Sequence, residues 1–264
     1  NKIGQQLTNW ANYLYGDTNK PIQINDIVHH STNLHHQLVE ELLRQENLDP
    51  EQITVVGYHG QSLYHDPSRA ITVQAGNGAM LAQQLNIQVV DNFRHNDVVA
   101  GGQGAPFAPI YHLALARRDR LLPCVIVNCG GIANLTILNN DDPSQIIGYD
   151  SGPGNGLLDR FIKARTQGQM QMDQDGQFGL QGQADQHVLN QLYEQSCRMK
   201  GQNFFTLKPP KSLDIRDFNL ITALNELSIE DGAATLAAFT AKTIVESLEL
   251  LEHVRMDVLL ELRD

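Results

Sequence analysis

The chain has 264 residues, 41% of them hydrophobic, with a formal net charge of −11 and an isoelectric point near 5.3. A chain of this length can bury about three quarters of its surface, which is enough for one large or two small domains. The acidic balance argues against nucleic acid as a partner, because that affinity comes largely from Lys and Arg side chains that neutralise phosphates.

The cysteines and the apolar segments indicate the compartment. Cys124, Cys129 and Cys197 are odd in number and lack CxxC spacing, so the sequence predicts neither a disulfide framework nor a zinc knuckle. No apolar run approaches the roughly 18 residues of a membrane span, and residues 1–16 form a polar helical pattern without the apolar region of a signal peptide. We expect a cytoplasmic protein with no membrane partner.

The first half of the chain alternates helical patterns with short apolar runs. Residues 31–48 predict a helix, with Ser31 as its N-cap and leucines at steps of three and four. The elements that follow are strands in 52–60, 70–76 and 87–93 and helices in 77–86 and 108–118. A domain boundary is predicted at Leu121-Leu122-Pro123, where a helical pattern ends and a new series of strands begins.

The second half begins with strands. The predicted elements are strands in 124–131, 133–138 and 146–150, a helix from about Asn155, a helix over 231–254 and a buried strand in 256–262. Such alternation of strands and helices predicts an α/β fold with a largely parallel sheet.

Two glycine-rich turns and one carboxylate are expected at strand ends. Gly130-Gly131 joins two strands, and its amides either face a phosphate or belong to an ordinary hairpin. Asp150 stands where the next strand stops, followed by SGPGN and a helix whose N-terminus carries about half a positive charge. Strand ends form the usual ligand crevice of α/β sheets, so these features predict a ligand site. A helix or turn cap is the structural alternative for Asp150.

Six ordered sequence blocks run from about Val56 to Ser212. They are GYHGQSLYHDP, VQAGNGAMLA, VVDNFRHNDVVAGGQGAPFAP, NCGGIANLTIL, YDSGPGNGLLD and PPKS, and the later AATLAAFTAKTI fits the same series. Together they resemble the anhydro-N-acetylmuramic acid kinase family, within the actin, Hsp70 and sugar-kinase superfamily. The resemblance implies a two-domain, ribonuclease H-like α/β fold. The first domain, 1–122, would supply substrate-cleft loops, and the second, 123–264, the phosphate hairpin and the catalytic Asp.

The resemblance also implies a reaction and its residues. Water opens the internal anhydro bridge of the amino sugar while the freed hydroxyl receives the γ-phosphoryl group of ATP, held with Mg²⁺, in the recycling of cell-wall peptidoglycan. Asp150 would be the general base, a role that typically contributes about a hundred- to ten-thousand-fold in rate. The other expected residues are His59, Asn77, Arg94, Asp97 and Asn155 for substrate, and Gly130, Gly131, Asn134, Gly152 and Gly154 for nucleotide phosphate. No direct protein ligand to the metal is predicted, and a homodimer is implied.

Several of these residues have alternatives. Arg94 can hold the carboxylate of the substrate by a two-pronged hydrogen bond, or pair with Asp91 or Asp97 in a salt bridge. Asp97 can instead bind sugar hydroxyls. His59 either lines the site or is a satisfied core histidine.

Two further segments are rich in ligand-type residues. The histidines of HHSTNLHH lack a carboxylate or cysteine to complete a metal site, so they are expected to be solvated helix residues. Lys208, Lys211 and Arg216 form a basic loop that either approaches ligand phosphate or is solvated, and Leu213-Asp214 stands where the commoner family form has Thr-Gly.

The resemblance stops at both ends of the chain. The family's GTSxDGxD phosphate turn and its glycine-rich adenosine loop have no counterpart here, so the chain is expected to be truncated at both ends. Phosphoryl transfer depends on positioning and charge stabilisation, so their loss would remove most activity. The kinase hypothesis therefore stands beside two others: a binding-only remnant or piece of a split enzyme, and a glycoside hydrolase working without ATP, for which no second acid stands out.

Overall fold

The computed structural model describes residues 2–14, 24–199, 201–209, 211–213, 217–251 and 258–259. The chain divides into two compact units, Asn1–Ala105 and Pro106–Asp264. This division lies before the boundary predicted at 122/123. Helix α5 (Ala108–Asp119) belongs to the second unit because it packs on strand β6 (Ile132–Leu138), where Leu113 and Ala116 of the helix meet Leu138 in one apolar cluster.

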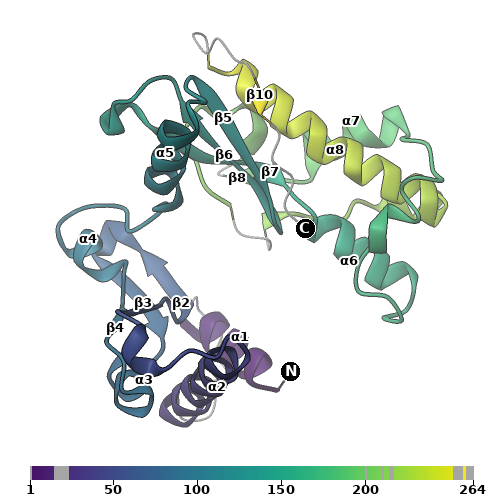
Figure 1. The fold of residues 1–264 in the computed structure, drawn as a ribbon. Coiled ribbons are helices and arrows are strands. Elements are labelled where there is room, and N and C mark those ends of the chain that lie inside the picture. Colours follow the sequence, from purple (N-terminus) through teal and green to yellow (C-terminus); the bar gives the residue numbers. More distant parts are fainter. Residues whose placement is uncertain are drawn as a thin grey trace. The chain divides into compact units, whose positions relative to one another are not determined.

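The first unit combines helices with two small sheets (Figure 1). Strand β1 (Val56–Tyr58) pairs in parallel with β4 (Val89–Asp91), and β2 (Gln61–Asp66) pairs antiparallel with β3 (Ile71–Ala75). Its helices are α1 (Lys2–Leu14), α2 (Ile24–Gln45), α3 (Gly78–Leu85) and α4 (His95–Val99). One buried cluster joins α1, α2, β2 and β3, and a second joins α2, α3 and β1.

Two elements of the first unit differ from the predictions. Ser31 is not the N-cap of its helix but a buried residue within α2, which already begins at Ile24. The apolar face extends towards the N-terminus because Ile27 packs against α1. Strand β2 was not predicted, since Leu63 is its one aliphatic side chain and its extended conformation depends on pairing with β3.

The second unit is built on a sheet with the strand order β10–β5–β6–β7. Strands β5 (Cys124–Cys129), β6 and β7 (Ile147–Pro153) are antiparallel neighbours, and β10 (Val258–Leu259) pairs in parallel with β5. The prediction of a largely parallel sheet is therefore wrong for this unit. The connections between β5, β6 and β7 hold no crossover helix, and such short connections join antiparallel strands.

Helices cover the second unit's sheet and form its largest apolar cluster. Helix α8 (Ile229–Glu249) runs beside β6 and β7 and packs on α6 (Gly156–Arg165) and α7 (Gln186–Gln195), as Figure 1 shows. The remaining hairpin is β8 (Arg198–Met199) with β9 (Gln202–Asn203). The helix predicted over 231–254 is confirmed as α8, although residues 252–254 lie outside the described part, as does most of the strand predicted in 256–262.

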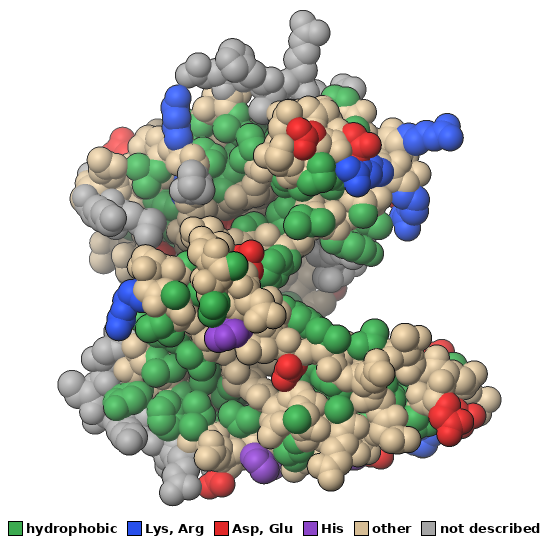
Figure 2. All heavy atoms as spheres, turned by 90° about the vertical axis from the view of Figure 1, so that its left-hand side faces the viewer, with side chains coloured by type: hydrophobic (Ala, Val, Ile, Leu, Met, Phe, Trp, Pro, Cys, Tyr) green, Lys and Arg blue, Asp and Glu red, His purple; other side chains and the backbone are tan. Residues whose placement is uncertain are grey.

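The surface carries scattered apolar side chains. On the face drawn in Figure 2, hydrophobic side chains lie among acidic, basic and neutral polar groups. Within the described ranges, no helix has the length and apolarity needed to cross a bilayer.

Candidate functional site

Asp150 lies inside strand β7 and not at its end, which corrects the prediction that the strand stops there. The register with β6 shifts between Ala133 and Asn134, so Ser151 is an extra residue in β7. Such a β-bulge bends its strand and re-aims neighbouring side chains, and bulges are frequent beside active sites. Ser151 is fully buried, and its hydroxyl donates to the carbonyl of Ala133 at 3.1 Å, which holds the bulge in place.

The segment 211–213 lies against β7, an edge strand of the sheet, at Asp150. The amide of Asp150 donates to the carbonyl of Lys211 at 3.1 Å, and the amide of Leu213 donates to the carboxylate oxygen Oδ2 of Asp150 at 2.7 Å. Burial raises the pKa of Asp150 above its ordinary value, and the Leu213 amide opposes that shift because it stabilises the carboxylate. Asp150 is therefore a half-buried carboxylate with an oriented hydrogen bond from a main-chain amide.

The two lysines of the basic loop that contains this segment differ in burial. Lys208 is exposed, whereas Lys211 is partly buried, and burial lowers the pKa of its ammonium group to about 8. Arg216 lies outside the described residues. Sequence reasoning missed the contact with Asp150, since the donor is a main-chain amide. The one feature of the sequence that could have pointed to this segment is that PPKS belongs to the series of ordered blocks.

The predicted hairpin at Gly130-Gly131 is confirmed, and it packs on the turn between β7 and α6. The amides of Gly154, Asn155 and Gly156 donate to the carbonyls of Gly130 and Gly131 at 2.7 to 3.2 Å. These three amides are therefore already satisfied by the protein and do not face a ligand.

The predicted phosphate-binding residues have different surroundings. Gly152 packs against Thr243, and Gly154 packs against Gly130. Gly131 is exposed, and a methyl group added there would meet no atom within 4 Å. Among the described residues, no acceptor lies opposite the amides of Gly131 and of Leu157, in the first turn of α6.

Two predicted site residues of this region, Asn134 and Asn155, carry side-chain amides. Asn134 lies opposite Asp150 in the β6–β7 ladder. Asn155 is exposed, precedes the first residue of α6, and donates from Nδ2 to the carbonyl of Cys129 at 3.4 Å. Asn134 therefore lies beside the carboxylate on the neighbouring strand, and Asn155 lies beside the glycine turns.

In the first unit, Arg94 and Asp97 both hold the glycine-rich loop that follows α4. Arg94 donates to the carbonyl of Gly104 at 2.7 Å, and Asp97 accepts from the amide of Gly104 at 2.6 Å. Neither alternative salt bridge, with Asp91 or with Asp97, occurs for Arg94 within the part of the chain that the structure describes. Partial burial lowers the pKa of the Arg94 guanidinium.

Gly104→Ala tests how firmly this loop is held. Gly104 is buried with φ +65°, and a Cβ atom there would lie 2.5 Å from Cγ2 of Val98. We expect a loss of about 2 kcal/mol in the free energy of unfolding, because left-handed backbone alone costs an L-residue about 1–2 kcal/mol. Urea denaturation measures the loss. The exposed neighbour Gln103, changed to Ala, is the matched control and should alter stability by less than about 0.5 kcal/mol. Equal stability of the two variants would contradict this account.

His59 is an exposed residue after β1, so the core-histidine alternative is wrong. It lines a pocket of about 310 Å³ together with His95 and Asp91. Asn77 has a structural role in the described fold, because its Oδ1 accepts from the amide of Met80 at 2.9 Å and caps helix α3.

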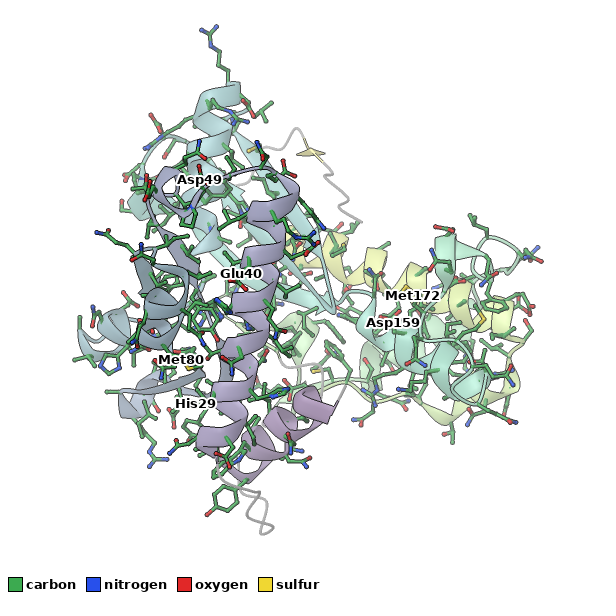
Figure 3. The ribbon with its side chains drawn as sticks, turned by 60° about the horizontal axis from the view of Figure 1, so that its bottom comes forward. His29, Glu40, Asp49, Met80, Asp159 and Met172 are labelled. Atoms are coloured by element: carbon green, nitrogen blue, oxygen red, sulfur yellow. The ribbon has the colours of Figure 1, made fainter. Side chains whose placement is uncertain are left out.

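The dense histidines lie along helix α2, as the positions of His29 and Glu40 in Figure 3 illustrate. His29, His30 and His35 are exposed, and His36 lies 3.4 Å from Glu40. The prediction of solvated helix residues is therefore confirmed for His29, His30 and His35, whereas His36 is partly buried. Across the described ranges, no group of three or more His, Cys, Asp or Glu side chains could hold a metal ion.

A half-buried carboxylate with a raised pKa, beside a bulge and a glycine turn, is typical of a catalytic centre. The fold and this site define a candidate α/β enzyme. The family model described as anhydro-N-acetylmuramic acid kinase matches residues 4–260, so the chain belongs to that family of sugar kinases. The mixed arrangement of helices and small sheets is consistent with this membership.

Individual relatives agree with the family match. A protein named anhydro-N-acetylmuramic acid kinase from Zymomonas mobilis is 39% identical over 261 residues, which is 91% of this chain and 68% of the relative. One of the same name from Bradyrhizobium diazoefficiens is 42% identical over 83% of this chain and 57% of its own length. A third, from Methylorubrum extorquens, is 39% identical over 92% of this chain and 62% of its own length. The chain thus spans about 57 to 68% of the length of these relatives.

Proposed function

We propose that the protein to which this chain belongs converts 1,6-anhydro-N-acetylmuramic acid and ATP into N-acetylmuramic acid 6-phosphate and ADP, in the recycling of cell-wall sugars. The observation that carries this proposal is Asp150, held by the amide of Leu213 beside the bulge at Ser151, in a chain of this kinase family. A two-domain ribonuclease H-like fold, a homodimer and a cytoplasmic location belong to the same proposal.

Asp150 acts as the general base. It takes a proton from a water molecule whose oxygen bonds to the anomeric carbon, and the bond from that carbon to the bridging oxygen breaks. The released 6-oxygen attacks the γ-phosphorus of ATP, and the bond to the β-phosphate oxygen breaks. The Leu213 amide binds Oδ2 of Asp150, which leaves Oδ1 to accept the proton. Burial strengthens the base, because it raises the carboxyl pKa towards the working pH.

ATP and Mg²⁺ fit the glycine turn and the start of α6. The amides of Gly131 and Leu157 point to no acceptor among the described residues, and a helix N-terminus favours anionic phosphate. Mg²⁺ is usually held by substrate phosphates, water and at most one or two carboxylates, so a site without a cluster of protein ligands suits it. When bound, Mg²⁺ neutralises charge that develops on the phosphates.

We propose that residues of the first unit bind the sugar. The pocket lined by His59 has polar walls, including Asp91 and Gln74, which suit the hydroxyl and acetamido groups of an amino sugar. Arg94 uses one N–H group on Gly104, and its remaining donors can hold the lactyl carboxylate in the planar geometry that a guanidinium favours. Asp97, which holds the same loop, is proposed to bind a sugar hydroxyl through Oδ1.

Mass spectrometry of the product tests the proposed function. The purified protein is incubated with the anhydro sugar, ATP and Mg²⁺ in water enriched in oxygen-18. The proposal expects one phosphoryl group and one oxygen-18 atom in the opened sugar, and no opened sugar without ATP. Opening that proceeds equally without ATP would identify a hydrolase instead. Binding of the sugar without any product would identify a binding protein.

The pH dependence of kcat/KM follows from the environment of Asp150. The base must be ionised, so the rate falls as pH decreases through its pKa, and burial places that pKa above the value of a solvent-exposed Asp. We expect an acidic limb with a slope of one, displaced towards neutral pH, in initial rates measured at constant ionic strength. An acidic limb at or below the range of an exposed carboxyl would contradict a buried base.

A further inference from the structure

The ammonium group of Lys211 lies among aromatic rings and main-chain carbonyls. Its Nζ is 4.7 Å from the centroid of the Phe204 ring and 5.8 Å from that of Tyr149, within the range of cation–π attraction. It also donates to the carbonyls of Phe204 and Phe205, both at 3.5 Å. Both phenylalanines are buried in the largest apolar cluster of the second unit. Lys211 is therefore attached to the buried core of the second unit.

The backbone next to Lys211 is attached to the candidate base. The carbonyl of Lys211 accepts from the amide of Asp150, and the amide two residues later, at Leu213, donates to the carboxylate of Asp150. Burial and the Leu213 amide are the influences on the pKa of Asp150, with no charged side chain of the described residues among them. The direction and basicity of the carboxylate thus depend on where the segment 211–213 lies.

A lysine at this position is unfavourable unless its charge has partners. Burial removes water from the charged ammonium group, and this loss of hydration lowers its pKa to about 8. The rings of Tyr149 and Phe204 and the two carbonyls partly replace the lost water. An apolar side chain would fill the same space but could not hydrogen-bond to those carbonyls, so it would hold the segment less firmly.

We propose that Lys211 is a positioning residue for Asp150: its buried ammonium group anchors the segment 211–213, and the anchored segment places the Leu213 amide on the carboxylate. Lys211 acts through Asp150 and not by touching substrate. The kinetic consequences rest on the proposed function, whereas the anchoring itself does not.

Kinetics of Lys211→Met test the proposal, because methionine removes the charge and keeps a long flexible side chain. We expect kcat to fall at least about tenfold while KM for sugar and for ATP stay within about twofold, since a misaligned base affects chemistry more than binding. The acidic limb of the pH profile should move to higher pH, because a carboxylate that loses its amide donor becomes more basic. Lys211→Arg should restore part of kcat.

Two further variants control for loss of structure. Lys163→Met removes an exposed lysine from the last turn of α6 and should leave all kinetic constants unchanged. Leu213→Pro removes the amide donor directly while Lys211 remains, so it should reproduce the fall in kcat and the shifted acidic limb. A Lys211→Met enzyme with the kcat and the pH profile of the unmodified protein would overturn the proposal.

Nuclear magnetic resonance tests the anchoring without any assay of activity. In protein labelled with nitrogen-15 leucine, the Leu213 amide resonance should move with pH as Asp150 titrates, and Asp150→Asn should abolish that movement. Lys211→Met should abolish it as well. If the unmodified protein does not phosphorylate the anhydro sugar, the proposed function fails and this titration alone decides the role of Lys211. A Leu213 resonance that still follows Asp150 in Lys211→Met would refute the anchoring.

Discussion

Asp150→Asn is expected to lower kcat for phosphorylation of the anhydro sugar by about a hundred- to ten-thousand-fold, the usual contribution of a positioned base. Asparagine has nearly the same shape, and its Oδ1 can accept the Leu213 amide that now binds the carboxylate. The substitution also removes a charge that burial disfavours, as the raised pKa of Asp150 indicates. The thermal midpoint should therefore change little while turnover is nearly lost.

Asp159→Asn is the matched control for this prediction. Asp159 lies in the first turn of α6, is half-buried, and has a pKa that burial also raises. Unlike Asp150, Asp159 is not next to a β-bulge and is not among the proposed catalytic residues. The kcat of Asp159→Asn should therefore stay near that of the unmodified protein. Initial rates and thermal midpoints of both variants are measured in parallel. An Asp150→Asn protein that keeps kcat within about threefold would exclude Asp150 as the base.

Gly154→Ala is expected to destabilise the second unit by about 3 kcal/mol. A methyl group at this position would overlap the carbonyl oxygen of Gly130 and lie 3.1 Å from the carbonyl carbons of Gly130 and Ile132. These are main-chain atoms, so relief requires the two turns to separate. Separation breaks the hydrogen bonds that Gly154, Asn155 and Gly156 donate to the hairpin, each worth about 1 kcal/mol net. The thermal midpoint should fall by roughly 6–12 °C.

Gly131→Ala is the control for crowding at the turns. A Cβ atom there would meet nothing within 4 Å, so the stability should stay within about 0.5 kcal/mol of the unmodified protein. Thermal unfolding of both variants, followed by circular dichroism, distinguishes a packing effect from a general intolerance of the glycine turn. Equal midpoints for the two variants would show that the contact between the turns contributes little.

Several elements could be predicted from local pattern. Helices α3, α5 and α8 and strands β5 and β6 follow from helical spacing or β-branched runs, and the glycine turn between those strands was predicted as well. Asp150 was singled out because an acid followed by SGPGN is unusual after an apolar run. These inferences succeed because side-chain periodicity and turn residues are local properties of the chain.

Other features depended on partners distant in sequence. Ser31 has the chemistry of an N-cap, but the packing of Ile27 against α1 extends helix α2 beyond it. The direction of the strands in the second unit depends on the connections between them rather than on their composition. For Arg94, the alternative to a ligand contact was a salt bridge to Asp91 or Asp97. The structure shows that Arg94 and Asp97 hold opposite main-chain groups of Gly104, a contact that residue types alone do not indicate.

The sequence by itself determined the family, the glycine turn and the carboxylate, because each is carried by residue types in a fixed local order. Only the tertiary structure decided how Asp150 is held. Its bulge is a register shift against β6, and its hydrogen-bond donor is a main-chain amide 63 positions away. A main-chain amide N–H is present in every residue except proline, and a register shift can occur in any strand, so neither leaves a recognisable pattern of side chains.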